Sequence, residues 1–211
     1  MESDDRLKEE QFSEKYATAD DGAYRLLRLL CMALSYALYR PSFCGREKIP
    51  KDGPVILASN HRSLPDAGFI ITSTRRTIRY LAKKELHEGL FGFLFRGART
   101  IPVDRNSHDG KSLAAAIRVL EMGNVIGVFP EGTRNRTAEP LLPFKFGAVK
   151  MAQETGAPII PLVVCCGKYR PLIDKARVYF ADPVWIGKDE DLEAANEKIR
   201  SLMEQMYLEN K

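Results

Sequence analysis

Residues 54–66 read Pro-Val-Ile-Leu-Ala-Ser-Asn-His-Arg-Ser-Leu-Pro-Asp, and this stretch joins a short apolar run to a polar segment. The run at residues 54–59 has the length and composition of a buried strand. His61 and Asp66 follow it directly. Because α/β proteins place chemistry at the carboxyl ends of such strands, the stretch predicts both a fold class and the position of a site.

The rest of the chain repeats the same alternation of apolar runs and helical patterns. Further strands are predicted at residues 78–82, 100–103, 124–129, 158–164 and 176–180, and helices at residues 107–122, 146–155 and 188–208. Strands that alternate with helices are typical of layered α/β proteins. We therefore predict an α/β fold with a largely parallel central sheet flanked by helices.

Composition limits the class of protein. The 211 residues suit one domain, and 45% hydrophobic and 28% charged residues exclude disorder. A net charge of +4 permits an acidic partner, but a nucleic-acid binder would carry denser basic clusters, so we expect no nucleic acid. The cysteines fit no zinc or disulfide pattern and indicate a reducing compartment; they are Cys31, Cys44, Cys165 and Cys166. The acidic N-terminus does not resemble a secretory signal.

Residues 23–40 predict an amphipathic helix of unusual character. Only eleven uncharged residues separate Arg28 from Arg40, which is too few to span a bilayer. On a helix, a stripe of Arg25, Arg28, Met32 and Ser35 runs beside a broad apolar surface of Leu26, Leu27, Leu30, Leu34 and Leu38. This pattern favours a helix that lies in the membrane interface, although packing against a soluble core would also explain it. We expect a membrane-interface segment at residues 1–40 and a catalytic domain at residues 41–211.

His61 and Asp66 are separated by five residues. Histidine suits proton transfer near neutral pH, and a nearby carboxylate fixes its tautomer and stabilises the imidazolium. The offset places the two side chains about 140° apart on an ideal helix, so they meet only if the chain turns. Ser63 to Asp66 predicts that turn as a capping box, with Ser63 as N-cap and Pro65 in the first turn. Alternatively, Asp66 only caps a helix and His61 is a loop residue.

Basic residues follow other predicted strands. Arg134 lies in the segment Phe-Pro-Glu-Gly-Thr-Arg-Asn-Arg at residues 129–136, while Lys83 and Arg105 follow two further predicted strands. In a parallel sheet these strand ends share one edge with His61, which predicts a site for an alcohol that carries a phosphate. Solvated charges at strand ends, or a polar turn with a structural Arg–Glu pair, are the alternative. The motifs of serine hydrolases, zinc proteases and nucleotide-binding loops are missing from the sequence, so the substrate is expected to supply the nucleophile.

Together these segments resemble the bacterial PlsC-type 1-acylglycerol-3-phosphate acyltransferases, within the glycerolipid acyltransferase family. Four blocks carry the resemblance: residues 60–66 (N-H-x-S-x-x-D), residues 97–105 (closing on Asp-Arg), residues 129–134 (F-P-E-G-T-R) and the proline-bracketed residues 157–162. Their order and spacing agree across residues 55–165. Asn135 departs from the pattern, because the family often has serine there.

The resemblance implies a reaction. His61 acts as general base on the free hydroxyl of a lysophosphatidate-like acceptor, and Asp66 orients it. The hydroxyl attacks an acyl thioester, acyl-CoA or acyl-carrier-protein, without an acyl-enzyme, and phosphatidic acid forms in phospholipid biosynthesis. Backbone N–H groups near the helix after Ser63 are candidates to bind the oxyanion. No metal or other cofactor is expected, and the lipid substrates imply peripheral attachment to the cytoplasmic face of the cell membrane.

The implied substrate-binding residues come from the same blocks and strand ends; they are Lys83, Arg105, Glu131, Gly132, Thr133 and Arg134. Arg134 and Lys83 would hold the phosphate with Arg105 nearby, while Glu131 and Gly132 would shape the acceptor pocket. Three alternatives remain: an acyltransferase acting on glycerol 3-phosphate or another lysolipid, a non-catalytic lipid-phosphate-binding protein, and a thioesterase that uses water as acceptor.

Overall fold

The computed structural model describes residues 2–17, 22–90, 92–104 and 110–211. In this part of the chain, one seven-stranded sheet has the order β1-β7-β6-β2-β5-β3-β4. The strands are β1 (Ser42–Cys44), β2 (Val55–Ser59), β3 (Ile78–Lys83), β4 (Ile101–Val103), β5 (Val125–Val128), β6 (Ile159–Cys165) and β7 (Arg177–Phe180). Every strand predicted from the sequence is present, and β1 is an additional one.

Strand direction decides where the loops meet. Strands β6, β2, β5, β3 and β4 pair in parallel, while β7 is antiparallel to β6 and β1 is parallel to β7. The carboxyl ends of the five parallel strands therefore lie along one edge of the sheet. This confirms the predicted α/β fold with a largely parallel sheet and brings together the segments that follow the strands.

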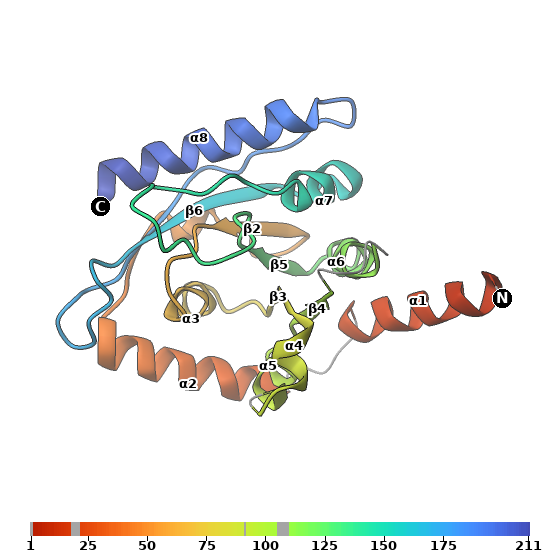
Figure 1. Ribbon diagram of the computed structural model, residues 1–211, viewed down its shortest axis with the longest axis horizontal. Coiled ribbons are helices and arrows are strands. Elements are labelled where there is room, and N and C mark those ends of the chain that lie inside the picture. The colour runs from red at the N-terminus through yellow and green to blue at the C-terminus, as the bar shows by residue number, and fades with distance from the viewer. Residues whose placement is uncertain (1, 18–21, 91, 105–109) are drawn as a thin grey trace.

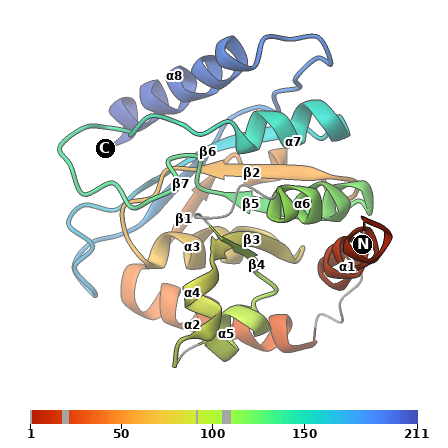
Figure 2. The same ribbon diagram turned by 45° about the vertical axis from the view of Figure 1, so that its right-hand side comes forward.

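Helices cover both faces of the sheet (Figures 1 and 2). They are α1 (Glu2–Ala17), α2 (Gly22–Tyr39), α3 (Pro65–Ser73), α4 (Lys84–Glu88), α5 (Gly92–Gly97), α6 (Lys111–Glu121), α7 (Gly147–Thr155) and α8 (Leu192–Asn210), with a 3₁₀ turn at Arg46–Lys48. In Figure 1, α7 and α8 lie above the sheet, and α2 and α3 lie below it. The helix predicted at residues 107–122 is α6, and residues 105–109 lie outside the described part of the chain.

Side chains alternate between the two faces, and this explains the continuous apolar runs. In β2, Ile56 and Ala58 join a core cluster with α6, α7 and α8, whereas Val55 and Leu57 join a second cluster with α3. All four are fully buried. A strand buried on both faces shows no alternation of apolar and polar residues, so a short apolar run is the only pattern that it leaves in the sequence.

Helix α1 packs against the sheet domain. Phe12 and Tyr16 lie against the first core cluster, and Ala17 is buried within it. An ion pair of 3.2 Å joins Glu14 to Arg118 of α6. The first part of the predicted membrane segment is therefore packed on the domain that follows it.

Helix α2 lies across α3 and turns its apolar side outward. Tyr24 is buried, and Arg28 Nε donates to the carbonyl of Thr74 at 2.9 Å. The predicted polar stripe thus faces the protein at Arg28. The opposite surface is exposed, with Leu26 at 62% and Leu34 at 60%. No helix of the described residues is long and apolar enough to cross a bilayer.

Candidate active site

The site lies where β2 and β5 end side by side. The two strands pair in register from Val55↔Val125 to Ala58↔Val128. The chain then leaves β2 toward His61 and leaves β5 toward Glu131. Because neighbouring strands lie about 4.8 Å apart, the two following segments start side by side, and a hydrogen bond from the His61 N–H to Glu131 Oε1 joins them.

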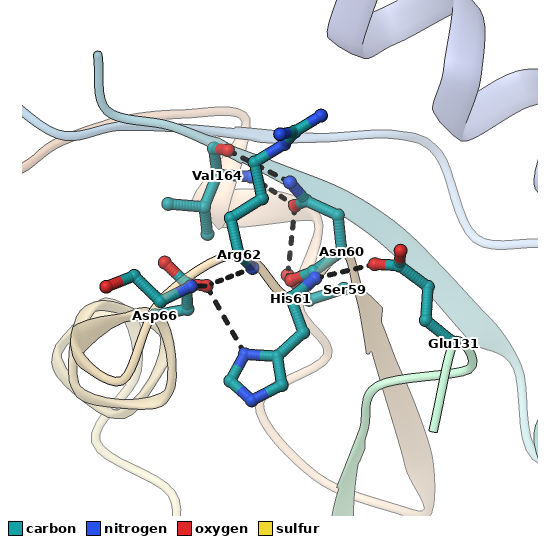
Figure 3. Close-up of polar contacts among 8 residues, drawn as sticks. Ser59, Asn60, His61, Arg62, Asp66, Glu131 and Val164 are labelled. Atoms are coloured by element: carbon teal, nitrogen blue, oxygen red, sulfur yellow. Dashed lines mark hydrogen bonds and ion pairs between the residues drawn. The ribbon is translucent and has the colours of Figure 1, made fainter. Parts of the chain in front are cut away.

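His61 and Asp66 meet, as predicted (Figure 3). His61 Nδ1 lies 3.3 Å from Asp66 Oδ2. The carboxylate is completely buried, whereas the imidazole keeps 20% of its surface exposed. When Nδ1 carries the proton that Asp66 accepts, the far nitrogen Nε2 has a free lone pair. That nitrogen points away from Asp66. The pair therefore presents a proton acceptor to solvent or substrate.

Asp66 also forms the turn that makes this meeting possible. Its Oδ2 accepts the backbone N–H groups of Arg62 and Ser63, both at 2.7 Å. The predicted capping box is formed only in part, because α3 begins at Pro65 with Leu64 as N-cap and makes no side-chain cap bond there. The N–H groups of Arg62 and Ser63 are occupied by the carboxylate. One oxygen thus fixes both the backbone turn and the ring of His61.

Asparagine residues fix the chain on either side of His61. Asn60 is fully buried; its Nδ2 donates to the carbonyl of Val164 at 3.1 Å, and its Oδ1 accepts the N–H of Val164 at 2.7 Å. These two hydrogen bonds extend the contact with β6 one residue beyond the end of β2. Asn135 N donates to the carbonyl of His61 at 2.7 Å. Sequence reasoning assigned neither contact.

The carboxylate of Glu131 binds two backbone N–H groups rather than a charged side chain. Its Oε1 accepts the N–H of His61 at 2.7 Å, and Oε2 accepts the N–H of Leu142 at 2.9 Å. Burial raises the pKa of this carboxyl, and the two backbone hydrogen bonds oppose that rise. The structure therefore adds a role to the predicted one: Glu131 fixes the position of the His61 backbone at the sheet edge.

The ring of His61 is also fixed by stacking. Its centroid lies 4.0 Å from that of Phe129, with 19° between the planes. Phe129 in turn stacks on Tyr80 of β3 at 5.7 Å. A contact with Asp66 at one edge and Phe129 on one face leaves the ring few orientations.

Two of the predicted cations, Lys83 and Arg134, lie at or after the ends of strands that end at the same sheet edge. Lys83 is the last residue of β3, which is two strands from β2, roughly 10 Å along the edge. Arg134 and Thr133 lie in the exposed turn after β5. Arg105 lies outside the described residues, directly after the segment that ends β4. The topology therefore places Lys83 and Arg134 at the same sheet edge as His61.

Gly132 shows why the turn after β5 needs glycine, and it identifies a further cation. Its φ is +65°, and a Cβ there would lie 2.8 Å from Cε and 3.3 Å from Nζ of Lys145. The N–H of Lys145 donates to the carbonyl of Pro130 at 2.8 Å. Lys145 thus lies against the predicted phosphate segment. A single lysine in a loop gave no sequence signal for this contact.

The adjacent cysteines are buried, as expected of small apolar residues. Cys165 and Cys166 are 7% and 4% exposed. Burial raises the pKa of Cys165 to about 11 and that of Cys166 to about 12. Both are thiols near pH 7, and a thiol is a poor nucleophile. Among the described residues, no three His, Cys, Asp or Glu side chains cluster as metal ligands.

Fold and site define an α/β protein with a hydrogen-bonded His–Asp pair and exposed basic residues at the carboxyl edge of a largely parallel sheet. Comparison with known proteins adds the family to which the chain belongs. A protein-family model described as Acyltransferase matches residues 40–165, more than half of the chain. This chain belongs to the acyltransferase family.

Individual relatives agree with that assignment. A 1-acyl-sn-glycerol-3-phosphate acyltransferase of Bacillus subtilis is 34% identical over 119 residues, which is 56% of this chain and 58% of that protein. One of Borreliella burgdorferi is 36% identical over 132 residues, 57% of this chain and 49% of that protein. The chain thus spans about half the length of the curated relatives it matches.

A solved structure shares the fold. The crystal structure of the 1-acyl-sn-glycerophosphate acyltransferase PlsC from Thermotoga maritima superposes with a TM-score of 0.74. The two chains are 24% identical, and the match covers 88% of this chain and 78% of the other. The similarity extends beyond the residues of the family match to most of the sheet and its helices.

Proposed function

We propose that this protein transfers a fatty acyl group from an acyl thioester to the free hydroxyl of 1-acylglycerol 3-phosphate, forming phosphatidate. The observation that carries the proposal is the buried Asp66 carboxylate held on His61 Nδ1, which leaves Nε2 as an exposed proton acceptor. The names of the matched relatives support the acceptor and the product.

The proposed reaction is a direct transfer. Nε2 of His61 removes the proton of the acceptor hydroxyl while that oxygen attacks the thioester carbonyl carbon. The C–S bond then breaks, and the leaving thiolate takes the proton from the imidazolium. Asp66 stabilises the transient positive charge on the ring. The buried thiols near the sheet edge take no part as nucleophiles, because their pKa values are high.

The proposed acceptor anchor is cationic. Arg134 and Lys83 would bind the phosphate oxygens, Arg105 would add a third cation, and Gly132 and Thr133 would let the backbone approach. Lys145 joins this set, because its ammonium lies beside Gly132. A phosphate held by several such groups fixes the distance of the reacting hydroxyl from His61, which is how proximity lowers the barrier.

One assay tests the proposal against its alternatives. Purified protein is given 1-acylglycerol 3-phosphate with acyl-CoA or acyl-carrier-protein, and phosphatidate and free thiol are followed together. We expect equal amounts of both products. Thiol without phosphatidate would indicate a thioesterase, and neither product would indicate a binding protein. Glycerol 3-phosphate as a second acceptor tests the remaining transferase alternative, and a chelator should leave the rate unchanged.

We also propose that the protein acts while attached to the surface of a membrane, at the cytoplasmic face, through α2. The support is the outward apolar surface of this helix, where Leu26, Leu30 and Leu34 are all more than half exposed. Contiguous exposed leucines beside arginines are typical of helices that lie in the lipid interface.

Point substitutions test the membrane proposal without opening the core. Deleting residues 1–40 would remove the buried Tyr24 and expose the second core cluster, so truncation is a poor test. Leu30→Asp with Leu34→Asp should reduce binding to anionic phospholipid vesicles at least ~10-fold. Leu208→Asp on α8 is the matched control, because Leu208 is also exposed. Equal vesicle binding by both variants would contradict the proposal.

A further inference from the structure

One oxygen of the buried Asp66 carboxylate lacks a well-formed hydrogen bond. Oδ2 accepts three donors, from His61, Arg62 and Ser63. Oδ1 is completely covered, and no described group donates to it with ordinary hydrogen-bond geometry. A buried carboxylate oxygen without a donor is costly, and native structures rarely leave one.

A second buried oxygen in the same state lies nearby, on Tyr169. The hydroxyl of Tyr169 is covered and also lacks a well-formed hydrogen bond to the described residues. Burial is the main cause that raises the pKa of this phenol, and Asp66 raises it further by its charge and by hydrogen bonding. The two groups are therefore close, although their contact lacks the geometry of a complete hydrogen bond.

The topology independently places Tyr169 beside the site. Strand β6 pairs in parallel with β2, with Leu162 opposite Ser59, so the segment after Cys165 leaves the sheet next to His61. Tyr169 lies four residues beyond that strand and packs against the second core cluster, which contains Phe69. Phe69 stands one helical turn after Asp66 on α3.

The backbone of Tyr169 is held in an uncommon conformation. Its φ is +56°, in the left-handed region that a bulky side chain rarely adopts. Neighbouring contacts maintain it. The Tyr169 N–H donates to the carbonyl of Cys166 at 3.0 Å, and the Tyr39 hydroxyl donates to the carbonyl of Tyr169 at 3.3 Å. The Tyr39 ring meets Phe69 edge to face at 5.3 Å. The strained residue is therefore tied to the helix that carries Asp66.

We propose that Tyr169 is a positioning residue whose hydroxyl donates to Asp66 Oδ1 and thereby fixes the carboxylate against His61. With both oxygens engaged, the carboxylate cannot rotate away from Nδ1 of the imidazole. The hydrogen bond from the phenol also partly neutralises the negative charge of the Asp66 carboxylate. Less of that charge then acts on the imidazole of His61.

The effect on protonation is read at His61, and several other titratable groups also face Asp66. They come from β3, the segment after β6, and α8, and they are Tyr80, Cys166 and Tyr207. The pKa of each is raised mainly by burial, and each is neutral near pH 7. Glu131 faces His61 itself, from the segment after β5, and accepts the His61 N–H. Tyr169→Phe leaves all of these groups in place, so a changed titration of His61 reports the lost phenol.

An NMR titration tests the proposal without requiring activity. The imidazole of His61 is followed from pH 5 to 9 in the full-length protein, and His61→Gln identifies its signal among the three histidines. In Tyr169→Phe we expect the titration curve of His61 to move to higher pH, because Asp66 then attracts the imidazole proton more strongly. Tyr179→Phe on β7 is the matched control and should leave it unchanged. An unaltered His61 titration in folded Tyr169→Phe would overturn the proposal.

Kinetics add a second measurement, which rests on the proposed function. Tyr169→Phe should lower kcat by about 10-fold, with little change in KM for lysophosphatidate. The acidic limb of the pH–rate profile should move to higher pH. Tyr39→Phe, which loosens the Tyr169 backbone only, should shift the His61 titration in the same direction by less. If no transfer occurs in the wild type, the proposed function fails while the titration still decides the role of Tyr169. A kcat loss with an unmoved His61 titration would mean a merely structural tyrosine.

Discussion

The two halves of the carboxyl sheet edge differ in how firmly their polar groups are held. Around β2 and β5, His61, Asp66 and Glu131 are each fixed by hydrogen bonds of 2.7 to 3.3 Å. On the basic side, Lys83 and Arg134 are exposed and form no ion pair within the described residues. Proton transfer requires fixed geometry, whereas a phosphate anchor requires charge at the right distance. The comparison predicts that substitutions on the first side impair the chemical step, and those on the second side impair binding.

The largest effect is expected for His61→Ala. Removing the base should lower phosphatidate formation by roughly 10³-fold or more. The fold should persist, because the backbone of His61 is held by Glu131 and Asn135 rather than by its ring. Initial rates and thermal unfolding of the same preparation measure both. A variant that keeps a tenth of the activity would remove His61 from the mechanism.

Asp66→Asn should damage both rate and stability, which distinguishes it from His61→Ala. An asparagine can place its amide oxygen where Oδ2 accepts its three contacts, but the acceptor then carries no charge, which weakens these buried hydrogen bonds and the stabilisation of the imidazolium. We expect a rate loss of about 10²-fold or more and a loss of unfolding free energy of about 1–3 kcal/mol. Urea unfolding beside the rate assay measures the two. Loss of activity at unchanged stability would show that Asp66 does not build the turn.

The basic side is tested by Arg134→Ala. Because the guanidinium is exposed and supports no fold contact, stability should change by less than about 0.5 kcal/mol. The KM for lysophosphatidate should rise about 10-fold, with kcat changed much less. Arg136→Ala, two residues along the same turn, is the control. An unchanged KM for the phosphorylated acceptor would contradict the anchoring role.

The smallest effect is expected for Glu131→Gln, seen in how stability depends on pH. Burial raises the pKa of Glu131 above its usual value of 4.5. The folded state therefore holds this proton more tightly than the unfolded state, and the stability contributed by protonated Glu131 is lost as pH rises from about 4.5 through the folded-state pKa. Glu131→Gln loses one of the two hydrogen bonds to backbone N–H groups, which lowers the free energy of unfolding by about 1 kcal/mol.

Urea unfolding of wild type and Glu131→Gln between pH 4 and 8 measures this difference. We expect the advantage of the wild type to be greatest at the acidic end and to shrink as pH rises. An advantage that widens with pH would mean that the folded protein favours the ionised carboxylate.

Much of this architecture could be predicted from the sequence. The apolar run at residues 54–59 locates β2, because a strand that is buried on both faces has apolar residues at every position. The helix predicted at residues 146–155 ends in the structure where Gly156, with a φ of +68°, follows α7. The pairing of His61 with Asp66 followed from Pro65 and the turn around it. These signals are local, and one short segment carries each of them.

The remaining features depend on contacts between distant segments. The hydrogen bond that turns Arg28 of α2 inward, to a carbonyl 46 residues away, left no signal in the sequence. The Asn60–Val164 pair spans 104 residues. The position of Lys145 beside Gly132 likewise depends on how a loop folds back. No local pattern in the sequence specifies such contacts, because folding of the whole sheet creates them.

The central claim is that the imidazole of His61 accepts the proton of the attacking hydroxyl. The most direct test compares two curves for the wild-type protein: kcat/KM for lysophosphatidate against pH, and the NMR titration of His61 over the same range. We predict that the acidic limb of the rate profile has the same midpoint as the titration of His61, since only the neutral ring is active. A rate that stays constant while His61 passes from charged to neutral would contradict the account.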